Sequence, residues 1–295
     1  MTVREKVLPD GTTKVHLFLD PSQMLNEAMI IPRYQIPTVQ VILPRLSGKK
    51  HKTFSIFDAL DGFTQVVLTD ESSLLTTMHT SWDRYCWLRL PYGISCAPGE
   101  FQLRMHEALE SLQDVYCVAD DILVVRRGDT VEEANRNHDL NVLALMKSAR
   151  GKNLRFNPQK IQFKLSKIII MGHVISDLGV KADPSKVKAF SDMPPPTDKQ
   201  GVMCFCGMVN YLNTLCPNLS QVIKPLLYLR KQGREFIWSD VHQEAFAKAK
   251  RLIASAPCLA YFINKRPVTL QVDASGGALL QPNDSGDLQP VAYTS

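Results

Sequence analysis

Two adjacent aspartates between apolar runs constrain most strongly how this chain can fold. The runs Val115–Ala119 and Ile122–Val125 are rich in β-branched residues, which is typical of strands, and Asp120 and Asp121 lie between them. The pattern predicts a β-hairpin with an acidic tip. Like charges this close raise each other's pKa, and burial raises it further, unless a cation neutralises them. The pair is therefore either a solvated turn or a metal site, and the hairpin alone favours neither.

Composition narrows the class of protein. The chain has 295 residues and a hydrophobic content of 45%, which suffices for a large core and predicts about two domains. No apolar run approaches the ~20 residues of a membrane span, and Met1–Lys6 lack the apolar core of a signal peptide, so we predict a cytoplasmic or nuclear protein without a membrane partner. Seven cysteines without C-x-x-C spacing predict reduced thiols rather than a zinc site.

Positive charge is concentrated in one stretch. The net charge of +5 permits nucleic-acid binding but does not require it. Between Lys147 and Lys167 every charged residue is basic, which suits contact with a phosphate backbone. The alternative for such a run is an ordinary solvated helix face.

A third aspartate ends another strand pattern. Thr53–Phe57 is apolar and precedes Asp58 directly. Carboxylates from neighbouring strands can hold divalent ions about 3.5–4 Å apart, the spacing used for in-line phosphoryl transfer. Hard oxygen ligands favour Mg²⁺. The alternative for Asp58 is a capping or turn residue at the strand end.

The remaining patterns predict mixed strands and helices. Strands are expected over 14–20, 66–68, 84–90, 153–163, 167–175, 269–275 and 290–295, and helices over 99–110, 130–149, 200–215, 220–231 and 240–254. Pro91 and Pro98 bracket Gly93 and predict a shaped loop.

The ordered motifs resemble the Pol polyprotein of gypsy-type LTR retrotransposons. Residues 54–65 resemble the first catalytic motif of reverse transcriptase, residues 90–102 the second, and residues 118–124 the Y-x-D-D box. Residues 154–160 and 171–176 resemble a later palm motif and the primer-gripping turn, and residues 210–212, 236–238 and 272–275 continue into a thumb and an RNase H-like domain. Each motif alone is weak, but their order and spacing together are specific.

The resemblance implies an α+β right-hand polymerase fold. Fingers and a palm with an antiparallel sheet would occupy residues 1–176, with fingers truncated at the N-terminus. A thumb-like or connection-like helical region would follow over 177–236, and the N-terminal part of an RNase H-like α/β domain over 237–295. Asp273 matches the first RNase H carboxylate, and the others would lie beyond Ser295, so RNase H activity is not expected.

The resemblance also implies RNA-directed DNA polymerase activity, a nucleotidyl transfer to a primer 3′-hydroxyl. Its partners would be an RNA or DNA template with primer, and dNTPs, while protein partners are not indicated. Asp58, Asp120 and Asp121 would be the catalytic residues and would bind two Mg²⁺ ions, with Mn²⁺ as a substitute. The nucleotide would contact Phe63, which would exclude a 2′-hydroxyl, together with Gln102, Lys160, Lys14 and His16. Primer and template would contact Pro91, Gly93, Met171, Gly172 and His173.

Two departures from the family pattern leave an alternative open. Val118 stands where the box usually begins with Tyr, and His16 stands where the fingers carry a triphosphate-binding Arg. A neutral His cannot make the bidentate phosphate contact of Arg. These departures favour a degenerate or co-opted fragment that at most binds nucleic acid, whereas the intact aspartates favour the enzyme. An unrelated α+β protein would require every motif to be accidental.

Overall fold

The computed structural model describes residues 2–7, 11–21, 24–31, 34–48, 51–231, 235–273 and 276–294. Within these ranges the side chains of residues 2, 4, 6, 14, 16, 17, 39, 40, 273 and 294 lie outside the description. The chain forms two compact units, one of Met1–Ile42 with His51–Leu165 and one of Leu43–Lys50 with Ser166–Ser295. The division after Leu165 differs from the predicted boundary after Ser176, so the predicted primer-gripping turn belongs to the second unit.

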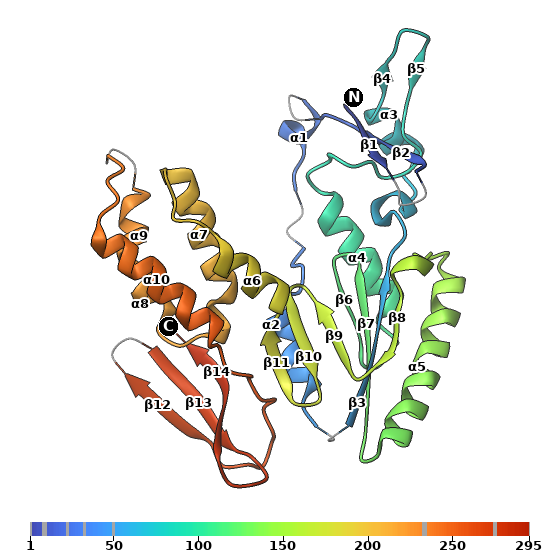
Figure 1. Ribbon diagram of the computed structural model, residues 1–295. Coiled ribbons are helices and arrows are strands. Elements are labelled where there is room, and N and C mark those ends of the chain that lie inside the picture. Colours follow the sequence, from blue (N-terminus) through green and yellow to red (C-terminus); the bar gives the residue numbers. More distant parts are fainter. Residues whose placement is uncertain are drawn as a thin grey trace. The chain divides into compact units, whose positions relative to one another are not determined.

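A four-stranded antiparallel sheet forms the centre of the first unit (Figure 1). Its strands follow the order β6-β7-β3-β8, with bounds Val115–Val118, Asp121–Gly128, His51–Asp58 and Gln162–Leu165. The β6–β7 hairpin and the strand that ends at Asp58 confirm the two strand patterns on which the site prediction depends. The strand predicted over 153–163 is wrong in its first part, because the segment holds the short 3₁₀ turn η3, Pro158–Lys160, and Pro158 has no N–H for a ladder.

Two helices cover one face of this sheet. They are α4, Ala97–Leu109, and α5, Val131–Gly151, and α5 begins where the Thr130 side chain accepts a hydrogen bond from the Glu133 N–H. Phe57 of β3 and Ile122 of β7 pack with apolar residues of both helices. Because side chains alternate along a strand, Asp58 and Asp121 lie on the opposite face.

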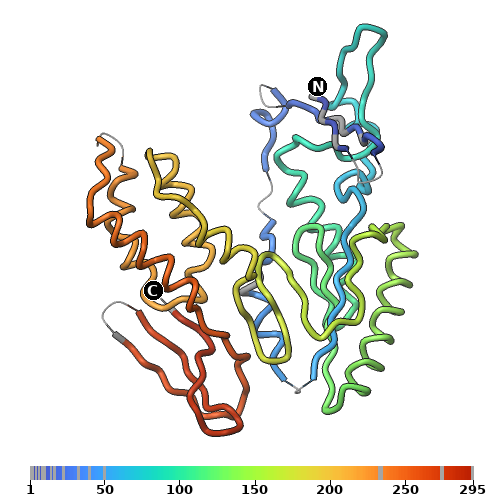
Figure 2. Tube along the Cα trace, viewed as in Figure 1, coloured from blue at the N-terminus to red at the C-terminus, as the bar shows by residue number. Residues whose placement is uncertain are grey.

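The rest of the first unit consists of short elements. They are β1 Thr2–Val7, β2 Thr13–Phe18, α1 Leu25–Ala28, α2 Val39–Ile42, η2 Gly62–Gln65, α3 Asp70–Leu75, β4 Met78–His79 and β5 Arg84–Tyr85. The strands predicted over 66–68 and 84–90 are shorter than expected, since beyond β5 they pair only through the bridge Val67–Arg89 and its flanking hydrogen bonds. The trace in Figure 2 shows the β4–β5 hairpin as a narrow projection, and Trp82 near its tip is 88% exposed.

The second unit contains two three-stranded sheets and a set of helices. The sheets have the orders β11-β10-β9 and β12-β13-β14, with bounds Gly179–Ala182, His173–Ser176, Lys167–Ile170, Thr269–Asp273, Gly276–Pro282 and Leu288–Thr294. The helices are η1 Leu43–Leu46, α6 Pro184–Asp192, α7 Lys199–Leu212, η4 Asn213–Leu215, α8 Leu219–Val222, α9 Lys224–Leu229 and α10 Asp240–Ala254. Phe205 packs between Phe190 and Phe246, with ring centroids 4.9 and 4.7 Å apart.

Local sequence explains where these helices agree with prediction. Helix α10 has the predicted bounds, because Ser239 and His242 cap its first turn reciprocally. The helix predicted over 220–231 is divided at Ile223, and Pro225 occupies the first turn of α9. In the described ranges we find no helix with the length and apolar character needed to cross a membrane.

Candidate active site

The register of the central sheet brings the predicted aspartates to one end of it. Asp58, the last residue of β3, lies directly opposite Asp121, the first residue of β7. Asp120 precedes Asp121 in the hairpin loop, and its carbonyl oxygen accepts a hydrogen bond from the Ala59 N–H at 2.9 Å. The carboxylates predicted to act together therefore come from adjacent strands.

The hairpin loop carries a strained residue. Ala119 has φ 52°, which lies in the left-handed region that non-glycine residues rarely occupy. The loop has only Ala119 and Asp120 between the paired residues Val118 and Asp121. A positive φ at the first position suits such a tight hairpin, and surrounding structure must hold it.

Gln102 supplies that support. Its side chain is 1% exposed, and its amide nitrogen donates to the Cys117 carbonyl at 3.1 Å. Its amide oxygen accepts from the Ala119 N–H at 3.0 Å. Both ends of the amide thus bind the backbone of the acidic hairpin. The nucleotide contact expected for Gln102 stays a prediction, and its observed partners are those of a residue that fixes the turn.

Two of the three carboxylates have a raised pKa. Burial and then the charge of Asp58 hold the pKa of Asp120 and of Asp121 above the ordinary value, while Lys160 acts in the opposite direction. Burial also raises the pKa of the Cys117 thiol to about 12, so this cysteine is a neutral neighbour of the site. The cluster therefore has a concentration of negative charge that a nearby cation reduces.

Lys160 provides part of that compensation. Its Nζ lies 3.1 and 2.9 Å from the two carboxylate oxygens of Asp58, so it donates to both. The Asp58 side chain is 14% exposed and that of Lys160 60% exposed. Hydrogen bonding to Asp58 raises the pKa of Lys160. The lysine predicted to contact the nucleotide is thus paired with a predicted metal ligand.

The three aspartates offer hard carboxylate oxygens, the kind of donor that magnesium prefers, and whether they bind it stays a prediction. Within the described ranges no group of three or more Asp, Glu, His or Cys side chains is arranged so that it could hold a metal ion, so Asp58, Asp120 and Asp121 do not form a ready-made site. Magnesium does not require one, because it keeps several waters and binds through one or two carboxylates together with substrate phosphates. The paired Asp58 and Asp121, with Asp120 beside them, supply ligands of this kind.

Phe63 packs against two aromatic rings near the aspartates. It lies in η2, and its ring centroid is 5.1 Å from that of Tyr92 and 5.7 Å from that of Phe101. These contacts fix the Phe63 side chain, and its contact with the nucleotide stays a prediction. The charges of Asp61, Asp120 and Asp58 add to burial in raising the pKa of the Tyr92 hydroxyl.

The loop that contains Pro91 and Gly93 is held against the N-terminal segment. Gly93 has φ 108°, and a Cβ there would lie 2.1 Å from the Leu19 carbonyl oxygen, so only glycine fits. The Asn26 side chain donates to the Gly93 carbonyl at 3.1 Å and accepts from the Ser95 N–H at 2.9 Å. Pro91 is buried. The primer or template contacts of Pro91 and Gly93 stay predictions.

In the second unit the predicted primer-gripping residues form the β9–β10 turn. Met171 and Gly172 have φ 46° and 67°, and Met171 is 44% exposed. His173 is 2% exposed, its Nδ1 lies 2.9 Å from the Met171 carbonyl oxygen, and its ring packs on Tyr211. His173 is thus a packed residue of the turn, while Met171 is exposed. The primer or template contacts of Met171, Gly172 and His173 stay predictions.

Three predicted site residues cannot be placed by their side chains. Lys14 and His16 have their backbones in β2, and Asp273 ends β12, but the side chains of all three lie outside the described residues. Val118, the departure from the tyrosine of the box, is 1% exposed and pairs with Asp121. The valine side chain, which is smaller than that of tyrosine, is therefore buried in the sheet beside Asp121.

Sequence reasoning missed Gly62 as a site residue. A Cβ on Gly62 would lie 2.7 Å from Asp120 Oδ1 and 3.0 Å from Phe101 Cζ, so the Asp120 carboxylate approaches the backbone closely here. The available signal was the Asp61-Gly62 pair within the motif at residues 54–65, a dipeptide that is typical of turns. Tyr92 was also missed, although it lies between Pro91 and Gly93.

Comparison with protein families shows to which family the chain belongs. Residues 19–194, more than half of the chain, match the family described as reverse transcriptase (RNA-dependent DNA polymerase). The chain belongs to the reverse transcriptase family. Residues 238–295 match the RNase H-like domain found in reverse transcriptases. The resemblance stated from the motifs is thereby confirmed, and an unrelated α+β protein is excluded.

Similar curated proteins are retrotransposon polyproteins. The retrovirus-related Pol polyprotein from transposon opus of Drosophila melanogaster is 30% identical over 99% of this chain and 30% of its own length. The corresponding polyprotein from transposon 412 is 27% identical over 100% of this chain and 24% of its own length. The Tf2-3 polyprotein of Schizosaccharomyces pombe is 29% identical over 97% of this chain and 21% of its own. The chain thus spans a third or less of these relatives.

Solved structures confirm the polymerase fold. A foamy viral protease-reverse transcriptase in complex with double-stranded DNA superposes with a TM-score of 0.80 at 22% identity, over 99% of this chain and 50% of that one. The same viral enzyme in complex with an RNA/DNA hybrid gives a TM-score of 0.76 at 21% identity, over 99% and 38%. This reverse transcriptase chain therefore has the predicted α+β fold.

Proposed function

We propose that this chain catalyses RNA-directed DNA synthesis, transferring nucleotides to a primer 3′-hydroxyl. The observation that carries the proposal is the meeting of Asp58 and Asp121 on adjacent strands, with Asp120 in the intervening loop, in a chain of the reverse transcriptase family. The division into fingers and palm (1–176), thumb-like region (177–236) and RNase H-like region (237–295) is part of the same proposal.

Each residue near the cluster has a proposed role. Asp58, Asp120 and Asp121 would hold two magnesium ions, which would activate the primer hydroxyl and neutralise the triphosphate. Phe63, backed by Tyr92 and Phe101, would exclude the 2′-hydroxyl of a ribonucleotide. Gln102 would keep the hairpin loop in its strained conformation.

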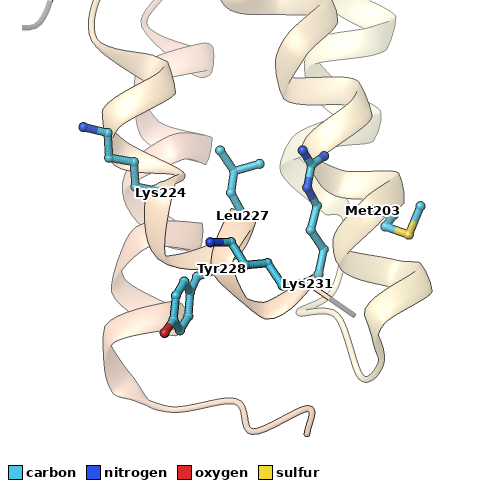
Figure 3. Close-up of a pocket in the computed structure, with 6 residues that line it drawn as sticks. Met203, Lys224, Leu227, Tyr228 and Lys231 are labelled. Atoms are coloured by element: carbon cyan, nitrogen blue, oxygen red, sulfur yellow. The ribbon is translucent and has the colours of Figure 1, made fainter. Parts of the chain in front are cut away.

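A basic pocket in the second unit supports a nucleic-acid partner. It has a volume of about 510 Å³, and Met203, Lys224, Leu227, Tyr228, Arg230 and Lys231 line it. Figure 3 shows Lys224, Leu227 and Tyr228 on α9, Lys231 shortly after the end of that helix, and Met203 on α7. These lining residues include three cations and no carboxylate. Such a surface suits the phosphate backbone of a template–primer duplex.

Primer extension tests the activity. The purified protein with Mg²⁺, dNTPs and a primed RNA template is expected to lengthen the primer, and Asp120→Asn is expected to abolish extension. Asp192→Asn changes an exposed aspartate of α6 in the second unit and serves as the matched control, with activity retained. Absence of extension by the unmodified protein with both Mg²⁺ and Mn²⁺ would overturn the proposal.

Duplex binding tests the partner separately. Fluorescence anisotropy with a labelled duplex should show affinity that falls steeply with salt. Replacing Lys224, Arg230 and Lys231 with Gln should weaken binding to all sequences alike and lower the salt slope by about one for each phosphate that a cation no longer neutralises. Binding without extension would instead support the co-opted, nucleic-acid-binding fragment.

A further inference from the structure

Lys160 occupies a place that catalysis with metal ions would require it to leave. Its ammonium donates to both oxygens of Asp58, at 3.1 and 2.9 Å. A carboxylate with both oxygens engaged by an ammonium presents its remaining lone pairs poorly to a second cation. The Asp58 side chain is largely buried, with 14% of it exposed. The Lys160 ammonium therefore covers part of the small surface through which solvent can reach this carboxylate.

The surroundings of Asp58 explain why a cation is held there. Asp58 pairs in register with Asp121, and Asp120 adjoins it in the hairpin loop. Like charges directly opposite each other destabilise a sheet. Lys160 reaches the cluster from η3, the short turn after Asn157, whose N–H donates to the Asp58 carbonyl at 2.8 Å. The backbone thus fixes the turn that carries the lysine next to the carboxylate.

We propose that Lys160 is a positioning residue that stands in for a divalent cation at Asp58 and competes with that cation for the carboxylate. In the absence of metal it holds the aspartates together by offsetting their charge. When a divalent ion binds Asp58, the ammonium leaves and becomes free for an anionic group. The inference rests on the proposed function only in naming Asp58 as a ligand of a divalent cation.

Competition predicts opposite effects of two substitutions. Lys160→Met removes the competitor while keeping a side chain of similar length, so the protein should bind Mn²⁺ more tightly, by about two- to five-fold, as expected for an exposed ion pair. Lys160→Arg keeps the charge and offers a planar fork that matches a carboxylate, so it should bind Mn²⁺ no more tightly than the unmodified protein. Free Mn²⁺ can be counted by electron paramagnetic resonance during titration of the full chain, without nucleic acid or nucleotide.

A matched control separates competition from a general change in charge. Lys164 also pairs with an aspartate, its Nζ lying 2.8 Å from Asp139 Oδ2, but Asp139 is not one of the cluster. Lys164→Met removes the same charge and should leave Mn²⁺ affinity unchanged. In an Asp58→Asn background, Lys160→Met should no longer tighten binding, because the shared carboxylate is gone.

Two results would overturn the inference. One is equal Mn²⁺ affinity for the unmodified protein and Lys160→Met, and the other is an equal gain for Lys160→Met and Lys164→Met. Neither result depends on primer extension. If the unmodified protein extends primers and Lys160→Met binds Mn²⁺ unchanged, only the inference fails. If extension is absent and the variants differ as expected, the polymerase proposal fails and the inference stands.

Discussion

Asp58 and Asp121 face each other across the β3–β7 ladder, as the terminal pair of two strands whose neighbouring pair, Phe57 and Ile122, is buried and apolar. Opposed like charges are unfavourable in a sheet, and here partial burial adds to the effect. This pairing therefore destabilises the fold at neutral pH. The repulsion between the two carboxylates can be measured as the difference in stability between this protein and a variant in which one of them is uncharged.

Asp121→Asn should stabilise the protein at neutral pH. Burial and then the charge of Asp58 raise the pKa of Asp121 above its ordinary value of 3.8. A raised folded-state pKa means that the stability associated with the protonated form is present below the unfolded pKa and is lost as pH rises through the folded pKa. The uncharged Asn avoids that loss. Since solvent screens a half-exposed group, we expect a rise in Tm of about 1–2 °C near pH 7.5.

The pH dependence of this gain provides its control. Near pH 4 and below, Asp121 takes up a proton in the folded protein, so the two proteins should approach the same Tm. Calorimetry of both at pH 4 and pH 7.5 measures the difference. A gain that is equal at the two pH values would show that charge is not its cause.

Gln102→Leu should weaken both the fold and the proposed activity. The substitution leaves the carbonyl of the buried Cys117 without its observed side-chain donor, and it removes the acceptor of the N–H of the exposed Ala119. An unsatisfied buried polar group destabilises by about 1–3 kcal/mol. The strained φ of Ala119 is then no longer held by a hydrogen bond from the side chain, so primer extension should fall more than stability alone explains.

Urea unfolding and single-turnover extension together check this expectation. Gln113→Leu, at an exposed glutamine just before the hairpin, is the matched control and should change neither quantity appreciably. A Gln102→Leu protein with normal turnover would show that the loop keeps its conformation without the amide.

The aspartates illustrate how far sequence reasoning reaches. Apolar runs before Asp58 and on both sides of Asp120 and Asp121 predicted the strands and the hairpin correctly, because strand patterns and tight turns are local. The joint action of the three carboxylates stays a prediction. The pairing of Lys160 with Asp58 could not be predicted in this way. It joins residues 102 positions apart and depends on where an irregular segment lies.

Other elements show the same difference between local signals, which the sequence reveals, and contacts between distant residues, which it does not. Helix α10 was predicted correctly from its N-cap at Ser239. The strand β13, Gly276–Pro282, was not predicted, because its glycine pair and terminal proline are atypical of strands and its pairing with β12 and β14 overrides that preference. The support of the Ala119 loop by Gln102 was likewise hidden, since a buried amide has no periodic signature.

Gly62→Ala should reduce primer extension while leaving the fold intact. A Cβ at this position would lie 2.7 Å from Asp120 Oδ1, so the carboxylate must move. A displacement of about 1 Å in a catalytic group can reduce turnover by about 10²-fold. Gly151→Ala is the control, because nothing lies within 4 Å of its added Cβ. Extension at the normal rate by Gly62→Ala would indicate that the position of Asp120 is not critical.

Gly172→Ala should destabilise the β9–β10 turn, and Tyr211→Phe should restore part of the loss. Gly172 has φ 67°, and its added Cβ would lie 2.7 Å from the Tyr211 hydroxyl oxygen. The left-handed backbone accounts for about 1–2 kcal/mol of the expected loss, and the clash adds to it. Removing the hydroxyl relieves only the clash. A double-mutant cycle in urea should therefore show a favourable coupling of about 0.5 kcal/mol or more between the two substitutions. Additive effects would mean that Tyr211 moves aside freely and does not hold the turn.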